Sequence, residues 1–391
     1  MNFILSDGDY REHLLPFTYT RPVADIRIGI LTIREKWERF LECKTSSLTK
    51  EYLSKKYPLS IEEKNIVIHA SYIPNIAFVN AVKALHHGEA LIWNEEVIAY
   101  ATSVPKAAFN LKDFKTVLFT EDLITVKNTW DIFSKNEAAL QADYDFITKG
   151  RKSASISNTN RVIAPENIFL EEGAAVEYSI LNATEGPIYL GKDSLVMEGN
   201  MIRGALALCE NAVVKMGAKI YGATTIGPYG KVCGEVSNSV IFGYSSKGHD
   251  GYLGNAVLGE WCNIGADSNN SNLKNNYDKV RLWNYATKSF DRTGLQFCGL
   301  MMGDHSKTAI NTMFNTGTVI GVNVNVYTPG FPRNFIPSFS WGGASGFSTY
   351  LPKKAFEAAK VMMARRNVEF DETEAEILQH VFEESKQWRK Y

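Results

Sequence analysis

The sequence predicts an α/β domain over residues 1–155, then a parallel β-helix over residues 156–345 and a helical extension over residues 346–391. Three observations lead to this prediction. A six-residue aliphatic repeat occupies the middle of the chain, strand-like and helical runs alternate before it, and a helical pattern follows Pro352. With 391 residues, the chain is long enough for two folded units with separate cores.

The central repeat is the strongest of these signals. From Ile188 onward, eight consecutive blocks of six residues each carry an aliphatic residue at the third position. A period of six suits neither an α-helix nor a long strand, but it suits a coil of short strands that each point one side chain inward. The expected inward residues are Leu190, Val196, Ile202, Leu208, Val214, Ile220, Ile226 and Val232, preceded by a less regular start at Ile163, Ile168 and Val176.

The repeat is interrupted at Asn238, resumes near Leu258 and is visible again at Ile320. Such interruptions are typical of loops that leave a solenoid, and loops on a rigid scaffold often carry functional side chains. We therefore expect a site in residues 234–278, where polar side chains concentrate.

The segments on either side of the repeat differ from it in kind. Residues 3–5, 66–68 and 116–119 are strand-like, and residues 33–41 and 76–85 are helical, which is typical of an α/β domain. The last helix is expected to begin at Asp371, with Glu374 completing a capping box. We expect it to pack across the open end of the β-helix or against a neighbouring subunit. Its apolar side carries Ile377, Leu378, Val381 and Trp388.

Composition excludes several classes of protein. The formal net charge of -1, without a basic stripe, argues against a nucleic-acid partner. The apolar start is too short for a signal peptide and no later run is long enough to span a membrane, so a cytoplasmic protein is expected. The five cysteines are scattered, odd in number and without a CxxC pair, which indicates buried thiols rather than disulfides or a zinc cluster.

The polar segment after the repeat resembles a known family. The run SSKGHDGYLGNAVLGEWCNIGAD, followed by NNYD, is similar to the acetyltransferase half of a bifunctional bacterial enzyme. That enzyme is both N-acetylglucosamine-1-phosphate uridyltransferase and glucosamine-1-phosphate N-acetyltransferase. The resemblance implies a left-handed β-helix, a homotrimer with acetyl-transfer sites between subunits, and acetyl-CoA as co-substrate.

The same resemblance assigns roles to single residues. His249 stands at the position of the family's general base, and Glu235 at that of a carboxylate that orients the base. Acyl transfer to an amine needs such a base, whereas a histidine taken at random is more often solvated in a loop. Lys219 replaces a phosphate-binding arginine, which keeps the charge but loses the bidentate fork. Sugar-phosphate contacts are implied for Tyr252, Asn263, Asn276 and Tyr277, and a place beside the acetyl-CoA thioester for Ala266.

The opening SDGDYREHLLPFTYTRPVADIRIG resembles a variant of the sugar nucleotidyltransferase signature. In that signature a glycine-rich turn and an arginine hold the triphosphate. Here the turn is reduced to one glycine, and an aspartate for Mg²⁺ is not evident, so no metal ligand is assigned. Two readings stay open, a nucleotide or sugar-phosphate site and a charged N-terminal loop. Both concern Asp7, Gly8, Asp9, Arg11 and Arg21.

Over nearly its whole length the chain resembles a branch of Bacteroidetes proteins that join such an opening to a hexapeptide β-helix. Three hypotheses follow. The first is a bifunctional enzyme of nucleotide-sugar synthesis that uses a sugar-1-phosphate, UTP or dTTP, Mg²⁺ and acetyl-CoA. The second is an acetyltransferase with a degenerate N-terminal domain, and the third is a non-catalytic trimerisation or regulatory platform.

Overall fold

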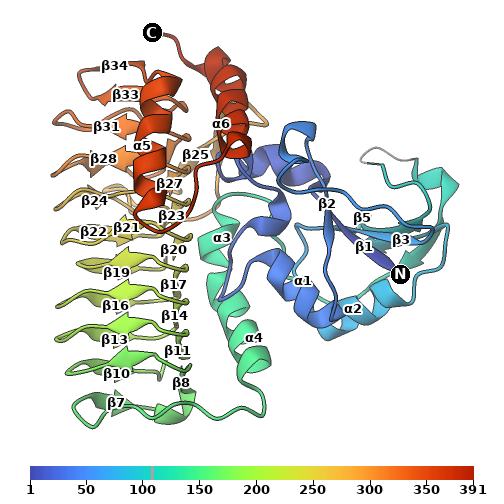
Figure 1. The fold of residues 1–391 in the computed structure, drawn as a ribbon, viewed down its shortest axis with the longest axis horizontal. Helices are drawn as coiled ribbons and strands as arrows, with labels where there is room; N and C mark the ends of the chain where they lie inside the picture. The colour runs from blue at the N-terminus through green and yellow to red at the C-terminus, as the bar shows by residue number, and fades with distance from the viewer. Residues whose placement is uncertain (107–109) are drawn as a thin grey trace. The chain divides into compact units, whose positions relative to one another are not determined.

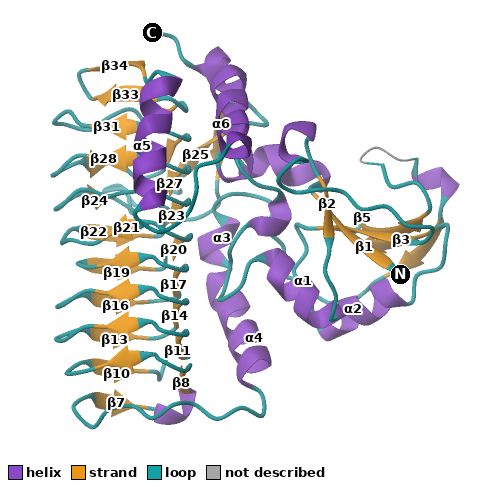
Figure 2. Ribbon diagram, in the orientation of Figure 1, coloured by secondary structure: helices purple, strands orange, loops and turns teal. Residues whose placement is uncertain are grey.

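The computed structural model describes residues 1–106 and 110–391, which form two compact units (Figure 1). The first unit consists of residues 1–14, 18–26 and 31–128, and the second of residues 15–17, 27–30 and 129–391. The first unit mixes helices with strands, whereas the second is dominated by short stacked strands (Figure 2). The predicted α/β domain and β-helix are both confirmed.

The first unit is built on one six-stranded sheet in the order β2-β1-β3-β5-β4-β6. The strand β1 runs parallel to β2 and β3, and β6 runs parallel to β4, whereas β5 is antiparallel to both of its neighbours. The predicted strands and helices are β1 (Asn2–Ser6), β3 (Asn65–His69), β6 (Lys115–Leu118), α1 (Ile33–Leu41) and α2 (Ile76–Lys83). The sheet also contains β2 (Ser46–Leu48), β4 (Glu89–Trp93) and β5 (Glu96–Thr102), which were not predicted.

The solenoid has three sheets, one for each side of the coil, and their strands are parallel except for the last, which is antiparallel to its neighbour. The first sheet contains β7 (Arg161–Ile163), β10 (Ile180–Asn182), β13 (Met201–Arg203), β16 (Lys219–Tyr221), β19 (Glu235–Ser237) and β22 (Tyr252–Gly254), followed by the pair β24 (Asn269–Asn270) and β29 (Met313–Phe314). The second contains β8 (Ile168–Leu170), β11 (Ile188–Leu190), β14 (Leu206–Leu208), β17 (Thr224–Ile226), β20 (Val240–Ile241), β23 (Val257–Leu258), β27 (Leu300–Met302), β30 (Thr318–Ile320) and β32 (Phe335–Ile336). The third contains β9 (Ala175–Val176), β12 (Leu195–Val196), β15 (Val213–Val214), β18 (Lys231–Val232) and β21 (Ser246–Lys247), and then β28 (Lys307–Thr308), β31 (Asn325–Val326), β33 (Ser340–Gly343) and β34 (Gly346–Thr349).

The aliphatic repeat forms the core of this coil. All eight predicted inward residues from Leu190 to Val232 are at most 2% exposed, and they pair with one another between successive turns. Upstream, Ile168 and Val176 are buried, but Ile163 is 49% exposed, so its predicted inward position is wrong. The repeat thus stabilises the solenoid by removing one aliphatic side chain per strand from water.

The predicted interruption at Asn238 is not a loop. The strands β19, β20, β21 and β22 continue the coil there, with Val236, Ile241 and Lys247 as the buried inward residues. From Val232 onward, the inward-facing residues follow one another at intervals of four, five and six residues, because two corners of the coil are shorter than those before them. The true excursion comes later, at residues 271–298, and holds the hairpin of β25 (Arg281–Asn284) and β26 (Ser289–Arg292).

One corner of the solenoid carries a ladder of stacked rings. Tyr229, Tyr244, Trp261 and His305 occupy equivalent corners, all with positive φ. Their rings lie within 13° of parallel, with centroid distances of 5.1, 4.1 and 6.2 Å in succession. His305 is only 5% exposed, although it lies in the turn between β27 and β28. Its ring stabilises the corner by stacking on Trp261.

Helices flank the solenoid in the second unit. The helices α3 (Asp131–Ser134) and α4 (Asn136–Thr148) precede the first coil, and the Asn136 amide donates to Thr225 Oγ1 at 3.1 Å. The helices α5 (Pro352–Ala364) and α6 (Glu372–Glu384) lie beside the last coils rather than across their end (Figure 1). Asp371 caps α6 by accepting from Glu374 N, as predicted.

Two further expectations can be compared with the structure. The cysteines are free thiols, but Cys43 is exposed and Cys233 only partly buried, so the expectation of buried thiols is wrong for these two residues. Among the described helices, none is long and apolar enough to cross a membrane.

Candidate functional site

Three of the predicted site residues form a column on the first sheet. Lys219, Glu235 and Tyr252 begin β16, β19 and β22, and each is the direct pairing partner of the next. Directly paired residues on neighbouring strands point to the same face, so these three side chains lie together on the outside of the coil. A cation, a carboxylate and a phenol are thereby presented side by side.

The column is joined by hydrogen bonds to its surroundings. The Tyr221 hydroxyl donates to the Glu235 carboxylate at 2.6 Å; partial burial and this bond raise the pKa of Tyr221 to about 12. Asn272 donates to the Tyr252 hydroxyl at 2.9 Å, and the Tyr252 N–H donates to the Asn269 side chain at 2.7 Å. Residues 269–272 therefore belong to this site, although no motif in the sequence singles them out individually.

His249 lies at the corner between β21 and β22, and its side chain is exposed. Within residues 1–106 and 110–391, no hydrogen bond joins the imidazole to Glu235, whose carboxylate bonds to Tyr221 instead. The main chain at His249 is held firmly, because the Lys247 ammonium donates to the carbonyl oxygens of His249 and Asp250. In the chain, His249 stands three residues before Tyr252, which begins β22.

The remaining predicted residues are dispersed. Asn263 is paired with Ser246 and Lys307, so it lies on the third sheet and not beside Tyr252. The Ala266 carbonyl accepts from Asn311 N at the next corner. Asn276 and Tyr277 lie in the excursion, where Tyr277 is 67% exposed.

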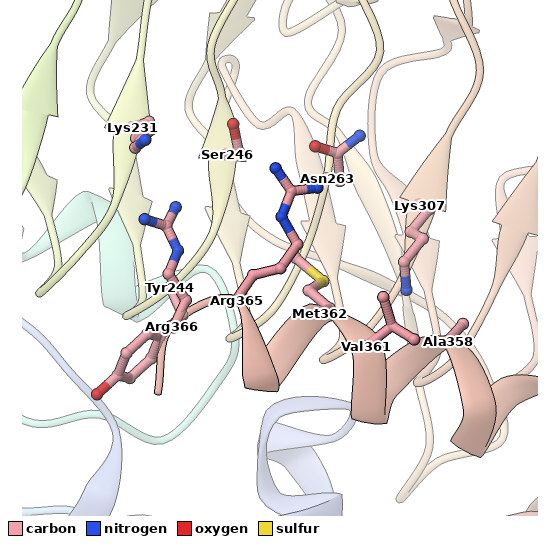
Figure 3. Close-up of a pocket in the computed structure, with 10 residues that line it drawn as sticks. All are labelled: Lys231, Tyr244, Ser246, Asn263, Lys307, Ala358, Val361, Met362, Arg365 and Arg366. Carbon is pink, nitrogen blue, oxygen red and sulfur yellow. The ribbon is translucent and has the colours of Figure 1, made fainter. Parts of the chain in front are cut away.

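A cationic groove of about 610 Å³ runs between α5 and the third sheet (Figure 3). Solenoid residues form one wall and residues of α5 and its C-terminal end the other, as Figure 3 shows. Four lining residues are cationic and none is acidic. The lining consists of Lys231, Tyr244, Ser246, Asn263, Lys307, Ala358, Val361, Met362, Arg365 and Arg366.

The charges in this groove repel one another. Burial, together with Arg366, Lys215 and Arg365, lowers the pKa of Lys231 below its ordinary value. Burial likewise lowers the pKa of Lys307. An arrangement of like charges with a Tyr244 ring beside it suits a ligand that carries several negative charges. The sequence does not indicate this groove, because its two walls come from separate segments, the coils that hold Lys231 to Lys307 and the helix that begins at Pro352.

In the first unit, most of the predicted nucleotide-binding residues are buried. Asp7, Arg11 and Arg21 are 6%, 3% and 3% exposed. The Asp7 carboxylate accepts from Val23 N and Thr49 Oγ1 and lies 3.3 Å from Arg11 Nε. Burial raises the pKa of Asp7, and Arg11 opposes this effect. These contacts fix the chain after β1, while Asp9 stays exposed.

A polar cluster lies at the carboxyl end of β3. The Glu96 carboxylate accepts from Lys127 Nζ at 2.5 Å, from Tyr10 at 2.6 Å and from Tyr72. Burial raises the pKa of the Glu96 carboxyl, but the three hydrogen bonds outweigh this effect, so the pKa lies below its ordinary value. The His69 ring packs against Gly8, where an added Cβ would lie 3.3 Å from Nδ1. Ligands of open α/β sheets bind at the carboxyl ends of parallel strands, which is where this cluster lies.

The comparisons with known proteins agree with both halves of the prediction. Residues 3–152 match the family model described as sugar nucleotidyl transferase. A bifunctional sugar-1-phosphate nucleotidylyltransferase/acetyltransferase from Sulfurisphaera tokodaii is 27% identical over 83% of this chain and 95% of its own. The bifunctional protein GlmU of Methanocaldococcus jannaschii is 32% identical over 23% of this chain and 21% of its own.

Solved structures with similarity to the chain include two UDP-N-acetylglucosamine acyltransferases. The Francisella novicida structure covers 59% of this chain and 87% of its own, with 13% identity and a TM-score of 0.31. The Bacteroides fragilis structure covers 59% and 91%, with 14% identity and a TM-score of 0.22. The sequence relatives identify the protein as a transferase, and the structure shows its α/β domain and its β-solenoid. Its residues 3–152 are similar to the sugar nucleotidyl transferases, and the resemblance to the bifunctional family is confirmed at low identity.

Proposed function

We propose that the chain is a bifunctional enzyme of nucleotide-sugar synthesis. Its solenoid acetylates an amino-sugar-1-phosphate from acetyl-CoA, and its N-terminal unit joins a sugar-1-phosphate to UTP or dTTP. The single observation that carries the solenoid part is the column of Lys219, Glu235 and Tyr252 at the corner that presents His249. We propose further that the enzyme works as a homotrimer, because the related family places its sites between subunits.

In the acetyl transfer, His249 takes the proton of the amine as its nitrogen attacks the thioester carbonyl. The carbon–sulfur bond then breaks, and the coenzyme leaves as a thiol after receiving a proton. Histidine is the commonest general base in such steps. Lys219 supplies a positive charge for the sugar phosphate, and Tyr252 supplies a hydroxyl to orient the sugar.

The cationic groove supports a phosphate-bearing acyl donor. Ser246 lines the groove and stands three residues before His249 in the sequence, and in this proposal the acyl donor extends from the groove towards the corner that carries the base. Coenzyme A carries a pyrophosphate and a further phosphate, which match the uncompensated charges of Lys231, Lys307 and Arg366. In this proposal the groove holds the phosphates and the thioester reaches His249.

For the N-terminal unit, the proposal places the nucleotide at the carboxyl ends of β1 and β3. No group of three or more metal-ligating side chains occurs in residues 1–106 and 110–391. Mg²⁺ commonly takes only one or two carboxylates besides substrate phosphates, and the exposed Asp9 fits that role. Bound there, Mg²⁺ would neutralise triphosphate charge. Lys127, held by Glu96, would add a fixed cation beside it.

The test is an assay of the purified protein with glucosamine-1-phosphate and acetyl-CoA that reads free thiol, in parallel with His249→Ala. The wild type should release thiol at least about 100-fold faster than the variant, since general-base catalysis contributes about that factor. Equal rates across several amino-sugar phosphates would contradict the acetyltransferase proposal.

Pyrophosphate release from UTP or dTTP with Mg²⁺ and a sugar-1-phosphate tests the N-terminal unit. Release with one of these pairs supports the bifunctional enzyme. Absence of release with every pair would favour the second candidate, an acetyltransferase alone. That candidate draws support from Asp7 and Arg11, which are engaged in buried structural contacts.

A further inference from the structure

Lys247 stands in the interior of the solenoid. It pairs with Val232, which in turn pairs with Val214, so it belongs to an inward column that is otherwise mostly valine. The residue is 1% exposed. Burial of an ammonium group among aliphatic side chains is costly unless the group is well hydrogen-bonded, so a lysine in this position calls for a physical reason.

The ammonium group of Lys247 bonds to the corner that carries His249. Its Nζ donates to the carbonyl oxygen of His249 and, at 2.8 Å, to that of Asp250. On the neighbouring coil, Lys215 Nζ donates to the carbonyl oxygen of Gly248 at 3.0 Å. Three successive carbonyl groups, 248 to 250, therefore accept from two lysines.

We propose that Lys247 is a positioning residue for the His249 imidazole. The inference rests on the proposed acetyl transfer. Because the Glu235 carboxylate bonds to Tyr221, the direction of the imidazole depends on the main chain of the corner. Lys247 fixes that main chain from inside the coil, and charge-assisted bonds of this kind are about twice as strong as neutral ones.

The experiment replaces Lys247 with methionine, which matches the unbranched apolar stem of lysine but removes the ammonium. A displaced base should lower kcat by roughly 10- to 100-fold, since misplacement by about 1 Å has effects of that size. The KM values for both substrates should stay within about twofold, because neither ligand touches Lys247. Lys192→Met, at an exposed corner of the same solenoid, is the matched control and should keep the wild-type kcat.

A pH profile separates positioning from simple structural support. Burial lowers the pKa of Lys247 to about 8, so the charge that strengthens its bonds is lost above that pH. The kcat of the wild type should therefore decline above about pH 8, whereas Lys247→Met should lack this decline.

The outcomes are distinguishable. A kcat of Lys247→Met within about twofold of the wild type would overturn the positioning role and leave the acetyltransferase intact. A rise in KM without a fall in kcat would also overturn it. If Lys247→Met does not fold, Lys215→Met is the second variant, because it removes the other lysine bond to this corner, the one to the Gly248 carbonyl. Its kcat should fall several-fold. An unchanged kcat would then refute the inference. Activity in His249→Ala would instead refute the proposed function itself.

Discussion

At the scale of single residues, the structure separates charges that hold the chain from charges that lie at the proposed nucleotide site. Asp7 and Arg11 are buried against each other, whereas Glu96 and Lys127 pair at the carboxyl end of β3. The sequence alone indicated the first pair by a motif. It could not indicate the second, because these two residues are 31 positions apart and are brought together only by the antiparallel strand β5.

Glu96→Gln should reduce pyrophosphate-forming activity by at least about tenfold. The neutral amide no longer holds the partly exposed Lys127 by charge, so the ammonium group is less firmly placed at the proposed nucleotide site. Pyrophosphate release measures the effect. Glu95→Gln, at the exposed neighbouring position, is the control. Equal losses in both variants would remove Glu96 from the proposed nucleotide site.

The buried Lys247 should make stability depend on pH. Its pKa is about 8 in the folded protein and about 10.4 in an unfolded chain, so between these values the unfolded chain binds more protons. Stability then rises with pH across this window. In urea titrations, the free energy of unfolding of the wild type should gain up to about 3 kcal/mol relative to Lys247→Met between about pH 7 and about pH 10. A constant difference across this range would contradict the burial of a charged lysine.

At the scale of elements, the six-residue period predicted the coil but misplaced its interruption. The coil shortens its corners after Val232, and Lys247 takes an inward position where an aliphatic residue is expected. A prediction based on the spacing of hydrophobic residues can no longer follow the six-residue repeat at such a point. For the same reason Asn263 could not be assigned to its face, since the face follows from the corners. By contrast, the column of Lys219, Glu235 and Tyr252 could have been predicted from the sequence by pairing the strands of successive coils.

The helix α5 gives a prediction about the acyl donor. The double variant Arg365→Ser and Arg366→Ser should raise the KM for acetyl-CoA by roughly tenfold or more and weaken its dependence on salt, because two phosphate-facing charges are lost. The KM for the sugar phosphate should not change. Lys353→Ser with Lys354→Ser removes the same charge from the exposed start of the helix and serves as the control. Equal effects would indicate general electrostatics and not a donor site.

At the scale of the whole molecule, the first sheet of the solenoid carries an apolar surface below the proposed site. Ile180 and Met201 are direct partners on β10 and β13, and they are 45% and 57% exposed. Met201 in turn pairs with Lys219, so the apolar surface continues into the column of site residues. Exposed apolar patches of this kind are typical of protein interfaces.

Light scattering should therefore give a mass three times the chain mass of 43.7 kDa. Met201→Asp should shift the protein towards the monomer, because a charge is placed in the apolar contact, and acetyl transfer should fall with it. Pyrophosphate release should be less affected. A monomeric wild type that acetylates its substrate would contradict sites shared between subunits.

The ladder of Tyr229, Tyr244, Trp261 and His305 should be detectable by circular dichroism spectroscopy. Phenol and indole rings 4.1 Å apart and nearly parallel couple their electronic transitions, which produces an intense circular dichroism signal in the near ultraviolet. That signal requires successive coils to be in register at one corner. The near-ultraviolet circular dichroism signal therefore reports the order of the solenoid beside the groove that Tyr244 lines. It can be measured without any attached dye.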